Sequence, residues 1–321
     1  MKELRAEITT FFTEFADLCA AFLEESFGEV RGNPGTEYLE KRCISSQELL
    51  SKNDVGYFDT LARGNDFSDR YRKLEGEFSH LKSYLTQRSP SRLQAEKEIG
   101  PLPCLYGPAG NNIFQRRIVF PIYNLSGELI NMYGRSVDED SPTPHVYASA
   151  VTCWYNLNRE DVQEANSLAV VEGVFDAFTL IQAGIKSTTA LCCGQYQYGA
   201  LHEFFMRSHF FKWGLVGQLR KLKKLETVYL CFDNDCSNGM FGSYHAVIVG
   251  KLLSENGFSV RIVHFPKDKD PNSMFVDEKT DEQSRIRFFQ ERYEELVGES
   301  VDYFVEQALL ELKELGLSDP H

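Results

Sequence analysis

The stretch LAVVEGVFDA, residues 168–177, decides how the rest of the chain is interpreted. Its first four residues form a short apolar run, typical of a buried strand in a parallel sheet. Glu172 and Gly173 end the run, and Asp176 follows one helical turn later. The stretch therefore predicts a buried strand that ends in a carboxylate and leads into a helix.

Strands and helices alternate around this stretch. Three further apolar runs predict strands, which we place at residues 187–191, 227–232 and 259–263. Helical patterns at 175–183 and 239–256 end at Gly184 and Gly257, which are common residues at helix ends. Because this order requires crossover connections, it predicts a mostly parallel sheet.

Acidic residues follow three of the four predicted strands: Glu172 follows the first, Asp233 and Asp235 the third, and Asp270 the fourth. The carboxyl ends of parallel strands meet at one edge of a sheet, where ligands gather. An extended Asp-x-Asp pair holds its carboxylates about 7 Å apart on one side. Such oxygens suit Mg²⁺, and a pair of ions would support phosphoryl transfer. With Asp176 these acids predict a metal site acting on nucleic acid; solvated loop acids are the alternative.

The chain has the composition of a folded protein but an awkward charge for one that binds nucleic acid. Its 321 residues are enough for two or three subdomains, and 42% of them are hydrophobic, as in an ordinary folded protein. The net charge is -13, whereas phosphate backbones attract basic surfaces. Residues 277–319 hold thirteen acidic and five basic residues. Residues 201–225, in contrast, hold six basic residues and one acidic residue. The acidity therefore weakens a nucleic-acid function without excluding it.

Several other classes of protein are disfavoured. The 8 cysteines form no C-x2-C pair, and free thiols suit a reducing cytoplasm. We find no signal peptide and no apolar run of about eighteen residues, so no membrane span is expected. The sequence lacks a phosphate-binding loop, a dinucleotide fingerprint, a zinc-protease motif and a serine-hydrolase elbow.

The flanking regions predict mixed structure. Residues 1–27 have the spacing of one amphipathic helix, whose apolar face packs either on this chain or on a partner. Two strands at 118–122 and 129–133 are joined by turn residues, which predicts a hairpin. Residues 283–315 have helical spacing. Shorter helices are expected near residues 36–42, 45–51 and 66–86.

Two motifs in this pattern resemble those of the TOPRIM domain: residues 168–177 and FDNDCSNG at 232–239. An ordered set of flanking motifs resembles the DnaG-type primase catalytic core over about residues 34–305. These are YLEKR at 38–42, VGY at 55–57, FQRRIVFPI at 114–122, SGELI at 126–130, YGR at 133–135 and KDPN at 269–272. The resemblance implies an α/β fold with a TOPRIM parallel-sheet domain.

The resemblance also implies a domain order. After an N-terminal helix at 1–33 we expect a mixed α+β primase-core subdomain at 34–165. The TOPRIM catalytic domain would follow at 166–275, and a helical C-terminal segment at 276–321.

By this resemblance the chain would be a DNA primase, an enzyme of DNA replication. It would make short RNA primers on a single-stranded DNA template from ribonucleoside triphosphates. Glu172 would help deprotonate the attacking 3′ hydroxyl, while Asp233, Asp235 and Asp270 would position Mg²⁺ or Mn²⁺. Asp176 would complete the acidic cluster.

Basic residues would meet nucleotide or template phosphates. Arg117 and Arg135 would line a basic ridge, although ordinary surface ion pairs are the alternative. The long basic stretch would offset contacts that the family makes elsewhere, and its four candidate residues are Arg220, Lys221, Lys223 and Lys224.

The departures from the family pattern leave alternatives open. We find no match to the family's N-terminal zinc-binding domain, so a separate template-recognition protein or a replicative helicase would act as partner. Asn272 stands where the family has a second aspartate, and HVYAS at 145–149 replaces a segment with a ridge lysine. A metal-dependent nuclease and a non-catalytic regulatory relative remain the rival interpretations.

Overall fold

The structure is a computed structural model, and it describes residues 2–27, 33–61, 66–99, 102–149, 153–192, 216–234 and 241–304. The chain divides into two compact units. Unit 1 comprises Met1–Lys41, Ser45–Val151 and Cys193–Gln197, and unit 2 comprises Arg42–Ile44, Thr152–Cys192 and Tyr198–His321. The second unit thus begins earlier than the expected boundary after residue 165, because a strand at Cys153–Tyr155 pairs within its sheet.

Unit 1 contains a four-stranded antiparallel sheet in the order β1-β2-β3-β4. Its strands are β1 (Gly56–Phe58), β2 (Arg117–Tyr123), β3 (Leu129–Ser136) and β4 (His145–Tyr147). The helices of unit 1 are α1 (Lys2–Ser26), α2 (Pro34–Lys41), α3 (Gln47–Lys52), α4 (Phe67–Glu77), the 3-10 turn η1 (Ser79–Leu81), α5 (Lys82–Leu85) and α6 (Pro90–Ile99). The predicted hairpin is confirmed as β2 and β3.

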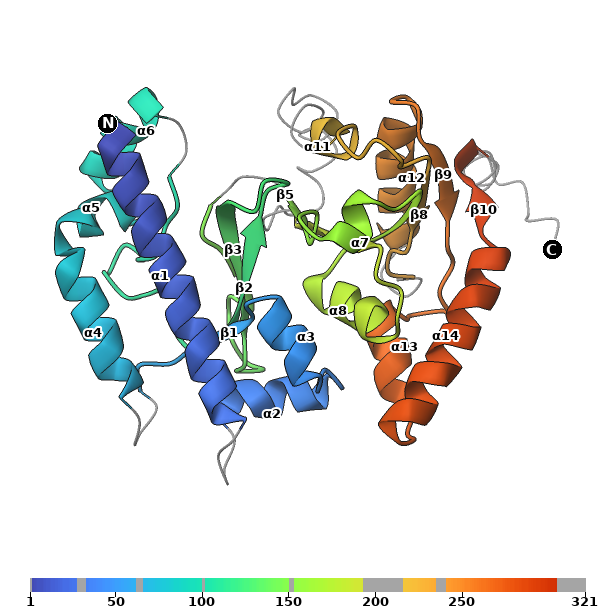
Figure 1. The fold of residues 1–321 in the computed structure, drawn as a ribbon, viewed down its shortest axis with the longest axis horizontal. Coiled ribbons are helices and arrows are strands. Elements are labelled where there is room, and N and C mark those ends of the chain that lie inside the picture. Colours follow the sequence, from blue (N-terminus) through green and yellow to red (C-terminus); the bar gives the residue numbers. More distant parts are fainter. Residues whose placement is uncertain are drawn as a thin grey trace. The chain divides into compact units, whose positions relative to one another are not determined.

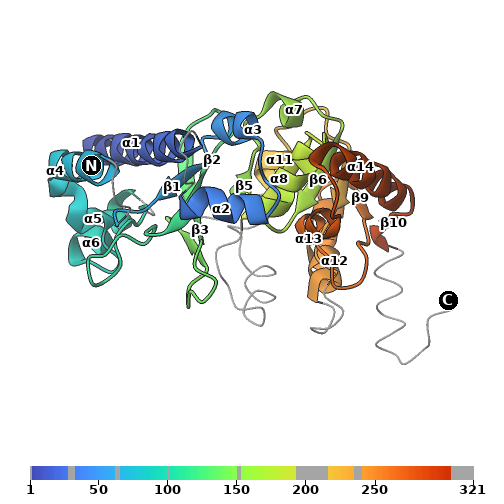
Figure 2. The same cartoon turned by 90° about the horizontal axis from the view of Figure 1, so that it is seen from below.

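Helix α1 confirms the predicted N-terminal helix, and its apolar face packs within unit 1. It lies against β1 and beside α4 (Figures 1 and 2). A Cβ atom on Gly56 would stand 2.5 Å from Cys19, so only glycine lets this strand approach the helix so closely. Phe22 stacks on Phe67 with ring centroids 4.3 Å apart. Packing inside the chain therefore accounts for the apolar face of this helix.

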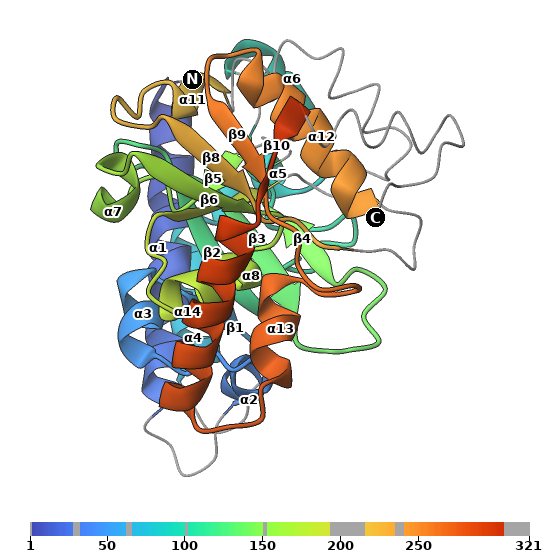
Figure 3. The same ribbon diagram turned by 90° about the vertical axis from the view of Figure 1, so that its right-hand side faces the viewer.

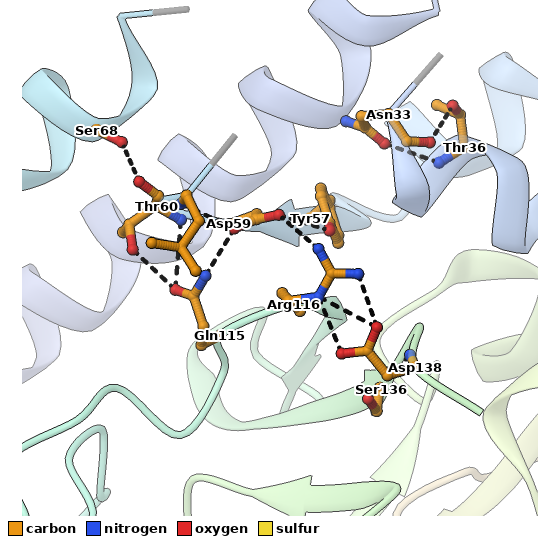
Figure 4. A network of polar contacts seen from close by, with 11 residues as sticks. Asn33, Thr36, Tyr57, Asp59, Thr60, Ser68, Gln115, Arg116, Ser136 and Asp138 are labelled. Carbon is orange, nitrogen blue, oxygen red and sulfur yellow. Dashed lines mark hydrogen bonds and ion pairs between the residues drawn. The ribbon is translucent and has the colours of Figure 1, made fainter. Parts of the chain in front are cut away.

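A polar network fixes the start of β2 (Figure 4). Arg116 donates to both oxygens of Asp138, and its Nη1 lies 3.4 Å from Asp59 Oδ2. Asp59 is buried and also accepts from Tyr57 Oη over 3.1 Å and Gln115 Nε2 over 2.7 Å. The carboxylate of Asp59 is thus surrounded by donors, as a buried charge requires.

Unit 2 contains a six-stranded sheet in the order β10-β9-β8-β6-β7-β5. Its strands are β5 (Cys153–Tyr155), β6 (Ser167–Val171), β7 (Thr188–Cys192), β8 (Thr227–Leu230), β9 (Ser259–Ile262) and β10 (Val301–Asp302). The four inner strands run parallel, as the sequence predicts, and the edge strands β5 and β10 run antiparallel to their neighbours.

Helices flank this sheet (Figures 1 and 3). They are α7 (Glu160–Gln163), α8 (Val174–Gln182), α11 (Gly217–Leu219), α12 (Phe241–Ser254), α13 (Pro271–Asp277) and α14 (Glu282–Gly298). The chain moves through α8 from β6 to β7, and through α12 from β8 to β9 in the opposite direction along the sheet. Right-handed crossovers therefore place α8 and α12 on opposite faces.

The expected helix at 283–315 is only partly right. Helix α14 ends at Gly298, and β10 follows it as an edge strand. Arg261 of β9 donates through Nε to Ser300 Oγ over 2.8 Å, which holds the chain at the sheet edge. The part of the expected helix from residue 305 lies outside the described residues. Among the helices that the structure describes, none is long and apolar enough to cross a membrane.

Candidate active site

Two acidic residues follow neighbouring parallel strands in the middle of the unit 2 sheet. Glu172 follows β6 and Asp233 lies just beyond β8, and these two strands pair directly. From β6 the chain moves to one side of the sheet, and from β8 it moves to the other. Such a reversal of strand order opens a crevice at the carboxyl ends, where α/β proteins bind ligands. The fold therefore brings both carboxylates to the expected edge.

The loop after β8 is tied to the loop after β9. Asn234 donates through its backbone N–H to Lys269 O over 3.1 Å and through Nδ2 to Phe265 O over 2.5 Å. In return, the N–H of Asp268 donates to Asn234 O over 2.8 Å. These bonds fix the backbone beside Asp233 relative to the segment that leads to Asp270.

Asp176 lies in the first turn of α8 and is buried. Its Oδ1 accepts from the backbone N–H of Asn272 over 3.1 Å. Burial raises the pKa of Asp176 well above its ordinary value, and the negative charges of Asp270 and Glu172 raise it further. Three predicted site residues therefore share one electrostatic environment.

Asp270 is the N-cap of α13, half-buried at the edge of the site. Its Oδ1 accepts from the N–H of Ser273 over 2.5 Å, and Ser273 Oγ accepts from the N–H of Asp270 over 2.9 Å. This capping box, with Pro271 at the start of the helix, is a strong local signal for a helix N-terminus. The cap holds one carboxylate oxygen of Asp270 in place.

The chemistry of the donor atoms suits a hard divalent cation. Glu172 Oε1 and Asp233 Oδ1 are shielded from solvent, and carboxylate oxygens are the ligands that Mg²⁺ prefers. A cavity of about 10 Å³, roughly the room for one water, lies beside Asp233. Within the described ranges no three His, Cys, Asp or Glu side chains are close enough to hold a metal. Asp235 lies outside these ranges, so the full predicted ligand set stays a prediction.

Comparison with known proteins finds a matching family and solved structures with a similar fold. Residues 169–275 match the Toprim-like family. The structure of the Aquifex aeolicus primase, comprising its zinc-binding and RNA polymerase domains, superposes with a TM-score of 0.60 at 20% identity, covering 96% of this chain and 64% of that one. A DnaG primase catalytic domain bound to ssDNA gives a TM-score of 0.59 at 20% identity, covering 96% and 86%.

The chain has the fold of the DnaG primase catalytic core. A DNA primase of Synechocystis sp. is 23% identical over 320 residues, which cover 96% of this chain and 44% of that relative. The chain therefore spans less than half the length of this curated relative. The resemblance expected from the sequence motifs, and the α/β fold with it, is confirmed.

The two predicted ridge arginines have structural partners in this primase-core fold. Arg117 is buried, and its guanidinium donates to Ile113 O over 2.8 Å, Pro144 O over 3.2 Å and Thr143 Oγ1 over 3.2 Å. Burial lowers the pKa of Arg117. The structure thus gives Arg117 a role in holding the β2 region, and its contact with phosphate stays a prediction.

Arg135 is only half-buried. It donates through Nε to Tyr38 Oη over 2.9 Å and through Nη1 to His145 Nε2 over 2.7 Å. The aromatic ring of Tyr133 stacks on His145 with centroids 5.9 Å apart. Neither predicted arginine forms the ordinary surface ion pair that was the alternative, at least among the ion pairs between described residues.

The described basic segment lies at the other end of the strands from the acids. Arg220 and Lys221 are exposed just after α11, and Lys223 and Lys224 are exposed just before β8. They precede β8, whereas Asp233 follows it. Strand β8 has 4 residues, and at a rise of about 3.3 Å per residue it alone separates the two groups by roughly 13 Å. The segment therefore does not line the acidic edge; residues 201–215 lie outside the described part.

Two residues near the acids were given no role by the sequence patterns. Arg42 and Thr179 both contact Asn272, at distances of 3.2 Å and 2.9 Å. Arg42 is 230 positions from Asn272 in the sequence, so no local spacing links them. Only the motif resemblance around residues 38–42 marked this region as part of the core.

Proposed function

We propose that this chain is the catalytic core of a DNA primase that makes short RNA primers on single-stranded DNA. The observation that carries the proposal is the pair Glu172 and Asp233 at the switch point of a Toprim-like sheet. The likeness to a DnaG catalytic domain bound to ssDNA supports the choice of template. Ribonucleoside triphosphates would be the second substrate.

The residues divide the chemistry between them. Glu172 would accept the proton of the attacking 3′ hydroxyl, as a general base. Asp233, Asp235 and Asp270 would hold Mg²⁺ or Mn²⁺, and Asp176 would complete the acidic cluster. The bound cation would make the hydroxyl more acidic and stabilise the leaving pyrophosphate. The tied loops around Asn234 would keep the carboxylates fixed during the reaction.

Nucleic acid and partners would meet other parts of the chain. Arg135 and the exposed basic segment at 220–224 are the candidates for contact with template phosphates. A replicative helicase or a separate template-recognition protein would deliver the template. A cytoplasmic location is part of the proposal, supported by free cysteines among the described residues.

The test is incorporation of labelled ribonucleotides on single-stranded DNA with Mg²⁺ or Mn²⁺. Glu172→Gln and Asp233→Asn should each lower incorporation by about 10²-fold or more, since each removes a charge from the reacting centre. Asp161→Asn is the matched control, because Asp161 is exposed in α7 of the same unit. Activity that survives both active-site changes would refute the assigned site. Cleavage of DNA without added nucleotides would favour the nuclease alternative.

A further inference from the structure

The side chain of Asn272 is enclosed and uses both ends of its amide. It is 1% exposed. Its Nδ2 donates to Arg42 O over 3.0 Å and to Thr179 Oγ1 over 2.9 Å, while its Oδ1 accepts from Arg42 Nη1 over 3.2 Å. Because a guanidinium only donates, the amide oxygen of Asn272 must be the end that faces the Arg42 guanidinium. Protein groups therefore occupy the whole polar part of this side chain.

Arg42 reaches this point on a short segment that belongs to unit 2, although both flanking segments belong to unit 1. Its guanidinium carbon lies 5.7 Å from the centroid of the Phe175 ring, within the range of a cation–π contact. One residue later, Cys43 O accepts from Gln182 Nε2 over 2.8 Å. The segment is thus held against both ends of α8.

Asn272 is linked to two of the acidic residues. Asn272 follows Asp270 by two positions in the first turn of α13, and its backbone N–H donates to Asp176. A shift of Asn272 would therefore move the cap carboxylate of Asp270 and release Asp176 together. Side chains that orient metal ligands in this way commonly change metal affinity by about 10- to 100-fold.

We propose that Arg42 and Asn272 form a clamp that positions Asp270 and Asp176 for cation binding, with Thr179 as its third member. Asn272 is then a positioning residue, and not a metal ligand that has lost its charge. The side chain of an aspartate at this position has no N–H to donate to Arg42 O or Thr179 Oγ1. This inference rests on the proposed function, since the cation is that of the acidic site.

The first experiment measures Mn²⁺ binding to the full chain by electron paramagnetic resonance, without nucleotide or DNA. Arg42→Lys keeps the positive charge but loses the planar fork. We expect it to bind Mn²⁺ about tenfold more weakly, and any loss reports geometry because the charge near the site is unchanged. Arg292→Lys is the control, since Arg292 is a half-exposed arginine of α14 in the same unit.

The second experiment uses Asn272→Asp, for which two explanations predict opposite signs. A restored ligand would tighten Mn²⁺ binding or add a second ion. The clamp predicts weaker binding, because the new carboxylate gives no donor to Arg42 O or Thr179. Thr179→Val, which keeps the shape and removes the hydroxyl acceptor, should also weaken binding, and it replaces Asn272→Asp if that variant does not fold by circular dichroism.

The outcomes separate the clamp from the proposed function. The clamp would be overturned if Arg42→Lys and Thr179→Val bind Mn²⁺ as tightly as the wild-type chain does. Tighter Mn²⁺ binding in Asn272→Asp would also overturn it. So would a wild-type chain that binds no Mn²⁺. If the variants bind as expected but the wild-type chain makes no RNA, the clamp stands and the primase assignment fails. RNA synthesis together with unchanged affinities would leave the primase assignment and remove the clamp.

Discussion

Gly173 and Asp176 lie so close that a Cβ atom on Gly173 would stand 2.5 Å from Asp176 Oδ2. No ordinary Cβ contact is that short, so the carboxylate occupies the space that any other residue would fill. Gly173 is also the N-cap of α8, in extended backbone that does not itself require glycine. The glycine after β6 is therefore needed for space beside the acidic cluster.

Gly173→Ala should displace the Asp176 carboxylate and disturb its bond to Asn272. We expect ribonucleotide incorporation to fall by about tenfold or more, as for other changes that misplace metal-orienting groups, while the protein stays folded. Gly298→Ala is the matched control, because a Cβ on Gly298 meets nothing within 4 Å. Equal activities of the two variants would show that the close approach does not matter.

Asp176 should lower the stability of the folded chain in the absence of metal. Its carboxylate is buried beside the charges of Asp270 and Glu172, which disfavours its ionised form. Asp176→Asn keeps an oxygen for the Asn272 N–H and removes the charge. We expect it to raise stability by about 1 kcal/mol in EDTA at pH 7, and to lower ribonucleotide incorporation. Thermal unfolding of both proteins is the measurement, and a lower Tm for the variant would contradict the prediction.

The parts of the fold that were predictable are those with strong local patterns. The run before Glu172, the α1 spacing and the turn between β2 and β3 each carry their own signal. The edge strands β5 and β10, with three and two residues, are too short for a period of two to be visible. Their positions depend on pairing with β7 and β9.

The same distinction holds at the site. Glu172 and Asp233 were predictable because strand ends of one sheet meet at one edge. The use of Asn272 was not, because its partner Arg42 lies 230 positions away and the bond forms only in the folded chain. The burial of Arg117 could not be predicted from the sequence either. Its acceptors include the backbone oxygens of Ile113 and Pro144, and every residue type carries such an oxygen.

The exposed basic segment gives a prediction about DNA affinity. Lys221→Gln with Lys223→Gln removes two charges from a surface before β8, at the opposite end of this strand from Asp233, so template binding should weaken without loss of Mn²⁺ binding. The slope of log affinity against log salt should become shallower by about 1 to 2. Arg72→Gln with Lys73→Gln, two exposed positions of α4, is the control. Fluorescence anisotropy with labelled single-stranded DNA at several salt concentrations measures the affinity and its salt dependence. If this variant has the same slope as the wild-type chain, the segment does not contact DNA.

The Arg116–Asp138 pair of Figure 4 makes stability depend on pH. Hydrogen bonding to Arg116 lowers the pKa of Asp138. An acid whose pKa falls on folding stabilises the protein above its unfolded value of about 3.9, and the contribution disappears as the pH falls through the lower folded value. Asp138→Asn should therefore lose up to about 1 kcal/mol at pH 7, a modest amount because the pair is exposed. Urea unfolding should show that the loss of unfolding free energy in Asp138→Asn, relative to wild type, shrinks below about pH 4. Asp140→Asn, a neighbouring exposed control, should show no such loss. A loss that stays the same at every pH would disprove the linkage.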